Sequence, residues 1–238
     1  MNLKNGCNML STNIMMLQTV ANGLGELKDN IVFVGGAVAE LYANDPAASD
    51  IRPTLDVDCV IELNSRIEHS RLEEKLRAKG FAHDTSIGAP ICRKIYKGIK
   101  VDVMPADSTV LGFSNQWYHE GIENRVLKAL PNGIEIFVFT PEYYLASKFA
   151  AHRGRGGNDL RQSHDFEDII YILDNCLEVL NSIKNANQIV KAYLKKECQD
   201  LLRNEGLTEG VESALPFDSD SDRTGFIENL IMNIAGIE

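Results

Sequence analysis

The chain has 238 residues, of which 44% are hydrophobic and 24% charged, and its formal net charge is -10. This charge excludes a general nucleic-acid coat, which needs clustered Lys and Arg. No run reaches the roughly 18 to 20 apolar residues of a membrane helix, and the five cysteines form no C-x-x-C pair. We therefore expect a soluble, cytoplasmic globular protein without a signal peptide or a disulfide framework.

Helices and strands alternate in the first half of the chain. Hydrophobic periodicity predicts these elements: a helix at 9–28, a strand at 31–34, a helix at 37–43, a strand at 55–63, a helix at 65–80 and strands at 91–97 and 99–104. Gly35 and Gly36 stop the first strand. Ser65 and Glu68 form a capping box for the helix that follows the second strand, and Lys97-Gly98 marks a hairpin.

The second half of the chain becomes almost entirely helical. It is predicted to contain strands at 125–130 and 134–140, then helices at 141–153, 164–177, 184–203 and 222–236. Asn132-Gly133 is a strong hairpin signal, and Thr140 with Pro141 is typical of a helix start. The acidic segment 204–222 is expected to be exposed and loosely ordered. This order predicts an α/β or α+β core over residues 1–140, with a mixed sheet flanked by helices, and a helical region over 141–238.

Two aspartates stand two residues apart in the segment 52-RPTLDVDCVIEL-63. Side chains of a strand alternate between its faces, so Asp56 and Asp58 point the same way and their apolar neighbours point the other way. Neighbouring carboxylates repel unless a cation lies between them, and a divalent metal ion is the simplest such cation. Asp102 interrupts the apolar strand 99–104. If the two strands pair, three carboxylates converge and suit two Mg²⁺ ions about 3.5–4 Å apart; a solvated strand face is the alternative.

Gly35 and Gly36 lie between a predicted strand and a predicted helix. A turn without side chains exposes backbone N–H groups beside a helix N-terminus, where phosphate oxygens bind. The glycines do not have the G-x-G-x-x-G spacing of a dinucleotide fingerprint, and the P-loop pattern is absent from the chain. The pair indicates either a phosphate cradle or a simple turn.

These motifs resemble those of the DNA polymerase β-like nucleotidyltransferase superfamily: a strand ending in Gly-Gly, a helix, R-x-T-x-D-V-D and a later strand with a third Asp. A downstream Lys helix and a D-x-x-D-[IL] helix are similar to those of the AbiEii-type branch. That branch includes toxins of toxin–antitoxin systems, and its relatives include small antibiotic-modifying nucleotidyltransferases. The resemblance covers roughly residues 30–175 and implies a polymerase β-like core.

The resemblance implies a role for each matching residue of the first half. It implies that Gly35 and Gly36 hold the triphosphate of a nucleotide. It also implies that Asp56 and Asp58 bind the metal ions and that Asp102 completes the metal site and activates the acceptor hydroxyl. Mg²⁺ is the expected cofactor, with two ions bound, and Mn²⁺ is an alternative.

Other matching residues have two interpretations each. Arg52 and Thr54 either contact phosphate or fix the loop before the strand. Lys148 matches a family lysine that meets the nucleotide phosphates, or it is a lysine on a helix face. Asp165 and Asp168 match the last family motif, although His164 stands where the family has Lys; alternatively, they are acids placed favourably at a helix N-terminus.

Positive charge is concentrated in one segment of this acidic chain. Residues 148–161 contain four basic side chains against a single acid, Asp159: Lys148, Arg153, Arg155 and Arg161. Such a cluster would steer a nucleotide or an RNA end towards a site. The alternative is a solvated flexible loop.

Together these features predict a metal-dependent nucleotidyltransferase that moves a nucleoside monophosphate from an NTP to an acceptor hydroxyl. The sequence leaves three acceptors open: an RNA such as a tRNA end, a protein, or a small molecule. A toxin would have an antitoxin protein as its partner. The alternatives are a metal-dependent nuclease using the same carboxylates, or a catalytically inactive nucleotidyltransferase fold that serves as a binding module.

Overall fold

The structure is a computed structural model that describes residues 10–45, 48, 51–155, 159–217, 219 and 221–238, without the side chain of residue 221. Several positions discussed above lie outside the described residues. They are Cys7, residue 9 at the start of the helix predicted at 9–28, part of the loop 44–53 and the centre of the loop 154–159. Two positions of the acidic segment, 218 and 220, also lie outside them.

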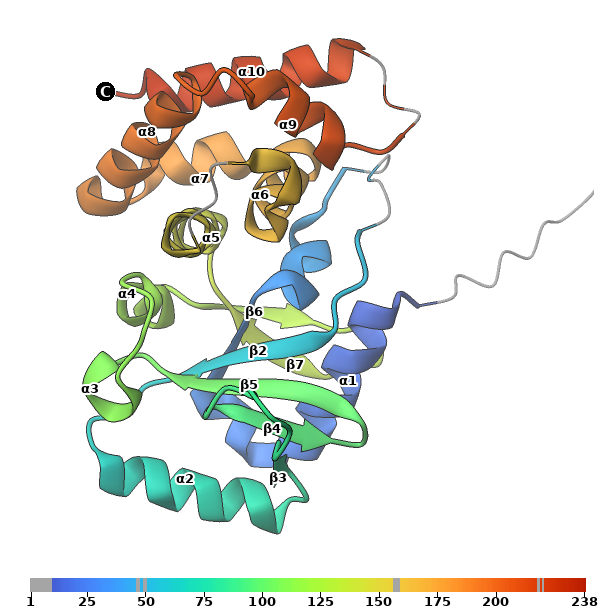
Figure 1. The fold of residues 1–238 in the computed structure, drawn as a ribbon, viewed down its shortest axis with the longest axis vertical. Coiled ribbons are helices and arrows are strands. Elements are labelled where there is room, and N and C mark those ends of the chain that lie inside the picture. Colours follow the sequence, from blue (N-terminus) through green and yellow to red (C-terminus); the bar gives the residue numbers. More distant parts are fainter. Residues whose placement is uncertain (1–9, 46–47, 49–50, 156–158, 218, 220) are drawn as a thin grey trace, which may run out of the picture.

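A seven-stranded mixed sheet forms the centre of the molecule, in the order β3-β4-β5-β2-β1-β7-β6 (Figure 1). Its strands are β1 (Ile31–Val34), β2 (Asp56–Ile61), β3 (Ala82–His83), β4 (Arg93–Tyr96), β5 (Ile99–Pro105), β6 (Val126–Ala129) and β7 (Glu135–Val138). In the middle of the sheet, β2 pairs in parallel with β5 and antiparallel with β1. This sheet with its surrounding helices confirms the α/β class.

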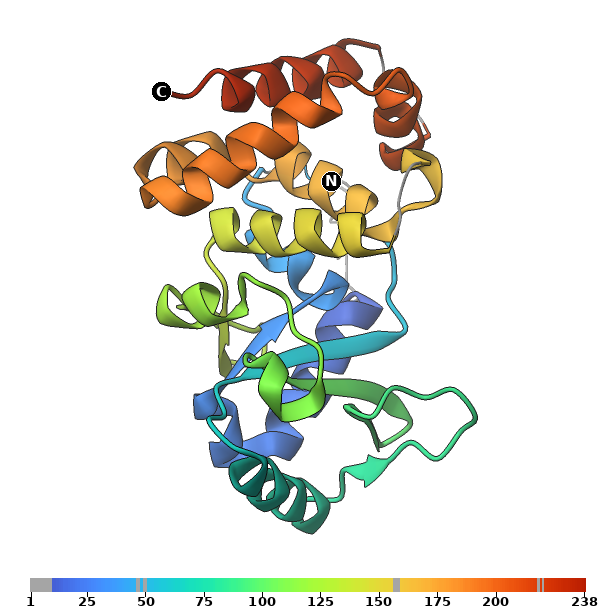
Figure 2. The ribbon, with the colours of Figure 1, turned by 60° about the vertical axis from the view of Figure 1, so that its left-hand side comes forward.

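Helices surround the sheet and dominate the end of the chain. The α-helices are α1 (Thr12–Leu24), α2 (Arg66–Ala78), α3 (Ser108–Leu111), α4 (Tyr118–Glu123), α5 (Pro141–Gly154), α6 (His164–Asn175), α7 (Val179–Asn185), α8 (Gln188–Leu201), α9 (Leu207–Ala214) and α10 (Ser221–Ala235). The 3₁₀ helices are η1 (Gly25–Asn30), η2 (Gly36–Tyr42) and η3 (Leu160–Gln162). Figures 1 and 2 show α6 to α10 at one end of the long axis and α2 at the other, with the sheet between them.

The two hairpins form at the turns that the sequence predicts. Lys97 and Gly98 have φ of 49° and 81°, the left-handed conformation that a two-residue turn between twisted strands requires. Gly133, in the turn between β6 and β7, has φ of 82°. The first of these turns sets the register of β4 on β5, and this register places Arg93 opposite Asp102.

The core fills both faces of the central strands. β1 is buried along its whole length, and Val57 and Cys59 of β2 are fully buried on the face opposite the aspartates, as alternation predicts. Each cysteine of the described chain is free and buried. Within the described residues, no helix is long and apolar enough to cross a membrane.

The prediction that residues 204–222 are loosely ordered is wrong for the part of the segment that forms a helix. Helix α9 occupies Leu207–Ala214 and buries Leu207, Gly210 and Val211. These residues lie three and four positions apart and form one helix face, while acidic residues occupy the other face. The acidic composition therefore reflects a solvated helix face.

Several predicted boundaries differ from the observed ones. The helix predicted over 184–203 is two helices, because Asn187 accepts hydrogen bonds from the N–H groups of Ile189 and Val190 and starts α8 anew. The element predicted at 37–43 is the 3₁₀ helix η2. Thr140 precedes α5, as expected, but its side chain makes no capping hydrogen bond. Strand β2 is shorter than 55–63, and Leu55 before it is 83% exposed.

Candidate functional site

Three carboxylates lie on two neighbouring strands. The parallel register of β2 and β5 pairs Asp58 with Asp102, and Asp56, two residues before Asp58, shares the face of the sheet on which Asp58 lies. The sequence could predict this convergence only on the condition that the two strands pair. The structure meets that condition, although a hairpin and a helix separate the strands in the chain.

Arg93 binds two of the three carboxylates. Its guanidinium contacts Asp102 in a bidentate manner, with 2.8 Å between Nε and Oδ1 and 2.7 Å between the NH2 group and Oδ2. The same NH2 group lies 3.0 Å from Oδ2 of Asp56. The hydrogen bond to Asp102 raises the pKa of Arg93, which is already a permanent cation. Sequence reasoning missed Arg93, since one basic residue in a strand gives no signal until the β4–β5 register is known.

The third carboxylate, Asp58, makes no contact with Arg93. It makes no hydrogen bond or ion pair within the described part of the chain. Burial, followed by the charge of Asp56, raises its pKa from 3.8 to about 7; Lys148 and Arg155 act in the opposite direction, and Asp102 adds to the increase. A half-buried carboxylate with this pKa is a ligand that gains from a cation.

The Gly-Gly turn packs directly against Asp58. Gly35 has φ of 72°, and a Cβ atom there would lie 2.0 Å from Oδ2 of Asp58. A Cβ atom on Gly36 would lie 2.7 Å from a methyl carbon of Thr54, 3.3 Å from Asp168 and 3.4 Å from Arg52. Both glycines are therefore required by close approach, and the turn joins the acidic strand to the R-x-T segment and to α6.

A buried asparagine on α1 fixes the R-x-T segment. The Asn13 amide donates to the backbone carbonyl of Arg52 at 3.1 Å and accepts from the N–H of Thr54 at 2.9 Å. Asn13 is 1% exposed within the buried face of α1. The sequence signal for it was a polar residue on the apolar face of a helix, and it was missed. Thr54 itself donates to the carbonyl of Asp56 at 3.0 Å, which supports the loop-fixing interpretation of this residue.

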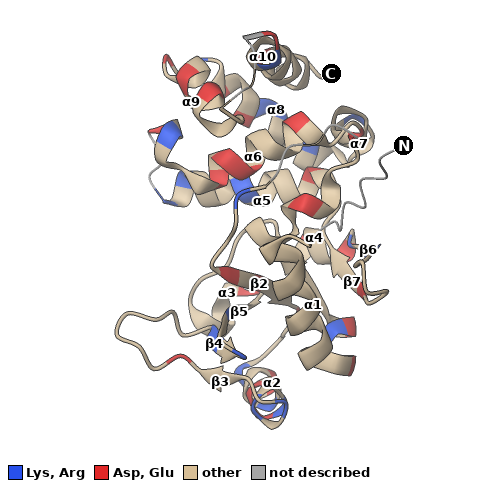
Figure 3. Cartoon of the chain, turned by 90° about the vertical axis from the view of Figure 1, so that its right-hand side faces the viewer, with Lys and Arg blue, Asp and Glu red and all other residues tan. Residues whose placement is uncertain are grey.

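A second charged cluster joins α5, α6 and Arg52. Nζ of Lys148 lies 2.6 Å from Asp168 and 3.2 Å from Asp165, and both acids are almost fully buried. Burial alone would lower the pKa of Lys148, but Asp168 and Asp165 outweigh it and raise the pKa. Arg52 lies 3.0 Å from Asp168, and Arg155 lies 2.6 Å from Asp165. In Figure 3 the red segment of β2 lies below α5, which carries blue segments, and α6, whose charged segments are red.

The basic segment 148–161 divides between this cluster and the helical scaffold. Lys148 and Arg155 belong to the cluster. Arg153 instead pairs with Glu197 and Asp200 on α8. Arg161 pairs with Asp159 and with Glu209 on α9. Tertiary contacts therefore neutralise charges that the sequence left free, and the basic patch is smaller than the sequence indicates.

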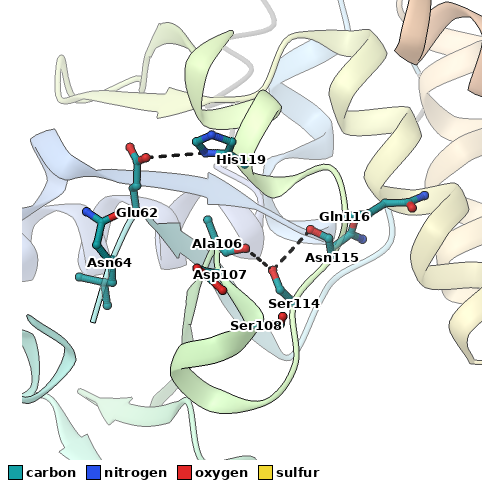
Figure 4. A pocket seen from close by; sticks show the side chains of 10 residues that line it. Glu62, Asn64, Ala106, Asp107, Ser108, Ser114, Asn115, Gln116 and His119 are labelled. Atoms are coloured by element: carbon teal, nitrogen blue, oxygen red, sulfur yellow. Dashed lines mark hydrogen bonds and ion pairs between the residues drawn. The ribbon is translucent and has the colours of Figure 1, made fainter. Parts of the chain in front are cut away.

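Two hollows share the loop that precedes α4. The first, of about 580 Å³, lies at the carboxyl ends of β2 and β5, where Glu62 pairs with His119 and the Ser114 hydroxyl donates to the carbonyl of Ala106 (Figure 4). The second, of about 740 Å³, lies between α5, α8 and the loop before α4, and Arg155 lines it. Residues 114–116 line both hollows. Through Arg155, the second hollow lies next to the charged cluster.

No group of three or more His, Cys, Asp or Glu side chains within the described ranges is arranged to hold a metal ion. The positions of the side chains give the reason, because Asp56 and Asp102 are turned towards Arg93 while Asp58 is not. The donor set nevertheless fits Mg²⁺ or Mn²⁺ chemically: three carboxylates on adjacent strands, one of them without a partner.

Comparison with protein families finds no matching family model, and comparison with curated proteins finds no relative. The geometry of the site is thus the basis for a functional proposal.

Proposed function

We propose that the protein is a metal-dependent nucleotidyltransferase with a polymerase β-like core, related to the AbiEii-type branch. The observation that supports this best is the β2–β5 register, which gathers Asp56, Asp58 and Asp102 beside the Gly-Gly turn. Lys148 lies close enough to lower the pKa of Asp58. An acidic face next to a cation-bearing helix is the charge arrangement that a metal–nucleotide complex requires.

The proposed reaction transfers a nucleoside monophosphate. The acceptor hydroxyl oxygen forms a bond to the α-phosphorus of the NTP, the bond from this phosphorus to the β-phosphate oxygen breaks, and pyrophosphate leaves with that electron pair. A carboxylate oxygen of Asp102 accepts the hydroxyl proton. When bound, Mg²⁺ supplies electrostatic stabilisation of the phosphate charges.

The residues of this chain bind and orient the reactants. Asp56 and Asp58 would hold the metal together with Asp102, and the Gly35-Gly36 turn would receive the triphosphate. Lys148 and Arg155 would bring positive charge to the phosphates, with Asp165 and Asp168 fixing the position of Lys148. Holding the reactants in line accounts for much of the rate acceleration in transfers of this kind.

The acceptor class and any partner follow from the resemblance rather than from this geometry. An RNA end, a protein side chain and a small molecule are all acceptors of the proposed chemistry. If the protein is a toxin, an antitoxin protein would be its partner.

One observation favours a second candidate function. Arg93 already neutralises Asp56 and Asp102, as expected if the fold is a binding module that no longer turns over nucleotides. The two candidates differ in whether the carboxylates bind a metal–nucleotide complex.

Calorimetric titration of each NTP, with and without Mg²⁺, tests the proposal. We expect Mg²⁺-dependent binding in the wild type and its loss in the double variant Asp56→Asn, Asp58→Asn, because the amides cannot replace ionised metal ligands. The matched control is Asp29→Asn, which alters an exposed aspartate paired with Lys28 and should bind as the wild type does. If none of the four NTPs binds, the transferase proposal is wrong and the binding module is favoured.

A further inference from the structure

Arg93 places a positive charge between carboxylates that would otherwise repel each other. No motif of the sequence indicates this role. It projects from β4, directly opposite Asp102 on β5. Its side chain is 17% exposed, and the Asp102 side chain is 10% exposed. The pair is thus largely withdrawn from solvent, where charge-assisted bidentate contacts are strong.

The contacts of Arg93 occupy the oxygens that a metal ion would use. Both carboxylate oxygens of Asp102 and one oxygen of Asp56 accept from the guanidinium at 2.7–3.0 Å. A divalent ion binds carboxylate oxygens at about 2.0–2.6 Å, and a guanidinium held on the same oxygens repels the ion and takes up part of their lone-pair directions. Asp58 and the second oxygen of Asp56 have no contact with the guanidinium.

We infer that Arg93 is the resident counter-cation of the acidic face and sets the affinity of the site for divalent metal, because it must release Asp56 and Asp102 before a metal ion binds all three carboxylates. The inference rests on the proposed function. In the protein without metal, Arg93 therefore neutralises Asp56 and Asp102, and free metal ions bind weakly. The position of Arg93 also explains why Asp58, unlike Asp56 and Asp102, has no ion pair among the described residues.

The test is titration of free Mn²⁺, without nucleotide, into the full-length protein, followed by calorimetry or by the electron paramagnetic resonance of the ion. The variant Arg93→Gln should bind Mn²⁺ about tenfold or more tightly than the wild type, since a strong charge-assisted competitor is gone. Arg93→Lys keeps the charge but loses the bidentate fork and should fall between the two. It also keeps the test informative if Arg93→Gln folds poorly.

Arg223→Gln is the matched control. Arg223 on α10 also makes a bidentate pair, at 2.7 and 2.8 Å, with the nearly buried Asp174. The variant therefore removes an equivalent ion pair away from the acidic face, and its Mn²⁺ affinity should equal that of the wild type.

Other outcomes would overturn the inference. Unchanged or weaker Mn²⁺ binding in both Arg93 variants would show that Arg93 does not compete with the metal, and equal strengthening in Arg223→Gln would show a general effect of charge. Failure of the inference and failure of the proposed function give different results. If Asp58→Asn abolishes Mn²⁺ binding but the Arg93 variants do not strengthen it, the metal site stands and the inference falls; if no protein binds Mn²⁺ and no NTP binds with Mg²⁺, both fall.

Discussion

Asp58 shows how the surroundings of one residue turn an ordinary side chain into a candidate ligand. Its neighbours Asp56 and Asp102 share Arg93, whereas Asp58 lies against Gly35 without a partner among the described residues. Burial and the neighbouring carboxylates raise its pKa to about 7. Ionised Asp58 therefore destabilises the folded protein when no metal is bound.

The raised pKa predicts a pH dependence of stability. In the unfolded chain Asp58 ionises near its ordinary 3.8, while the folded protein keeps the proton up to about 7. Between these values the folded state binds more protons, so the free energy of unfolding falls as pH rises, and the loss is complete above about pH 7. We expect Asp58→Asn to be more stable than the wild type by roughly 2–4 kcal/mol at pH 8.

Urea denaturation with a chelator present, at pH 5 and pH 8, measures this difference. The stabilisation by Asp58→Asn should be smaller at pH 5, and Asp29→Asn should follow the wild type at both values. A gap between Asp58→Asn and the wild type that is equal at the two pH values would contradict the assignment of the titration to Asp58.

At the scale of elements, α9 shows how packing orders an acidic segment. A Cβ atom on Gly210 would lie 2.7 Å from Cβ of Leu160 in η3 and 3.2 Å from the Phe166 ring of α6. The helix therefore approaches its neighbours more closely than any larger residue would allow. Gly210 has a packing role that the sequence pattern did not reveal.

Gly210→Ala distinguishes an ordered α9 from a loose segment. In a solvated helix or flexible segment this change would be neutral or stabilising by up to about 1 kcal/mol. In the observed packing it should lower the free energy of unfolding by about 1–3 kcal/mol, because the added methyl group overpacks the contact. Ser213→Ala on the exposed face of α9 is the control for helix propensity, and chemical denaturation of both variants is the measurement.

At the scale of the whole molecule, the charged cluster connects the sheet region to the C-terminal helices. Arg52 comes from the loop before β2 and Lys148 from α5, yet both contact Asp168 on α6. Helix α6 also packs on η2, next to the Gly-Gly turn. The candidate site is thus built from both sides of the predicted boundary at residue 140, and the division into two regions stays a prediction.

Removal of the lysine should therefore affect the whole fold. Lys148→Met leaves Asp165 and Asp168 buried with only Arg155 and Arg52 as partners. We expect the free energy of unfolding to fall by about 3 kcal/mol, as is typical when one member of a buried ion pair is lost. The control is Lys75→Met at an exposed position of α2, whose free energy of unfolding is expected to lie within about 0.5 kcal/mol of that of the wild type. Thermal unfolding monitored by circular dichroism compares the variants, and equal stability of Lys148→Met and the wild type would contradict a buried cluster.

The sequence by itself determined the local features of this protein. Period-two alternation placed Asp56 and Asp58 on one strand face with Val57 and Cys59 on the other, and Asn132-Gly133 and Lys97-Gly98 fixed the hairpins. Backbone preference and side-chain alternation act over a few residues, so a local pattern contains them.

Only the tertiary structure decided which charges meet. The β2–β5 register placed Asp58 beside Asp102, and the β4–β5 register brought Arg93 onto Asp56 and Asp102. Helix packing gave Arg153 and Arg161 partners of their own. An ion pair between residues far apart in the chain depends on strand register and helix docking, which arise from the summed burial of many apolar side chains. A short motif does not contain this information. For this reason the sequence did not predict that Arg93 is the counter-charge of the candidate metal site.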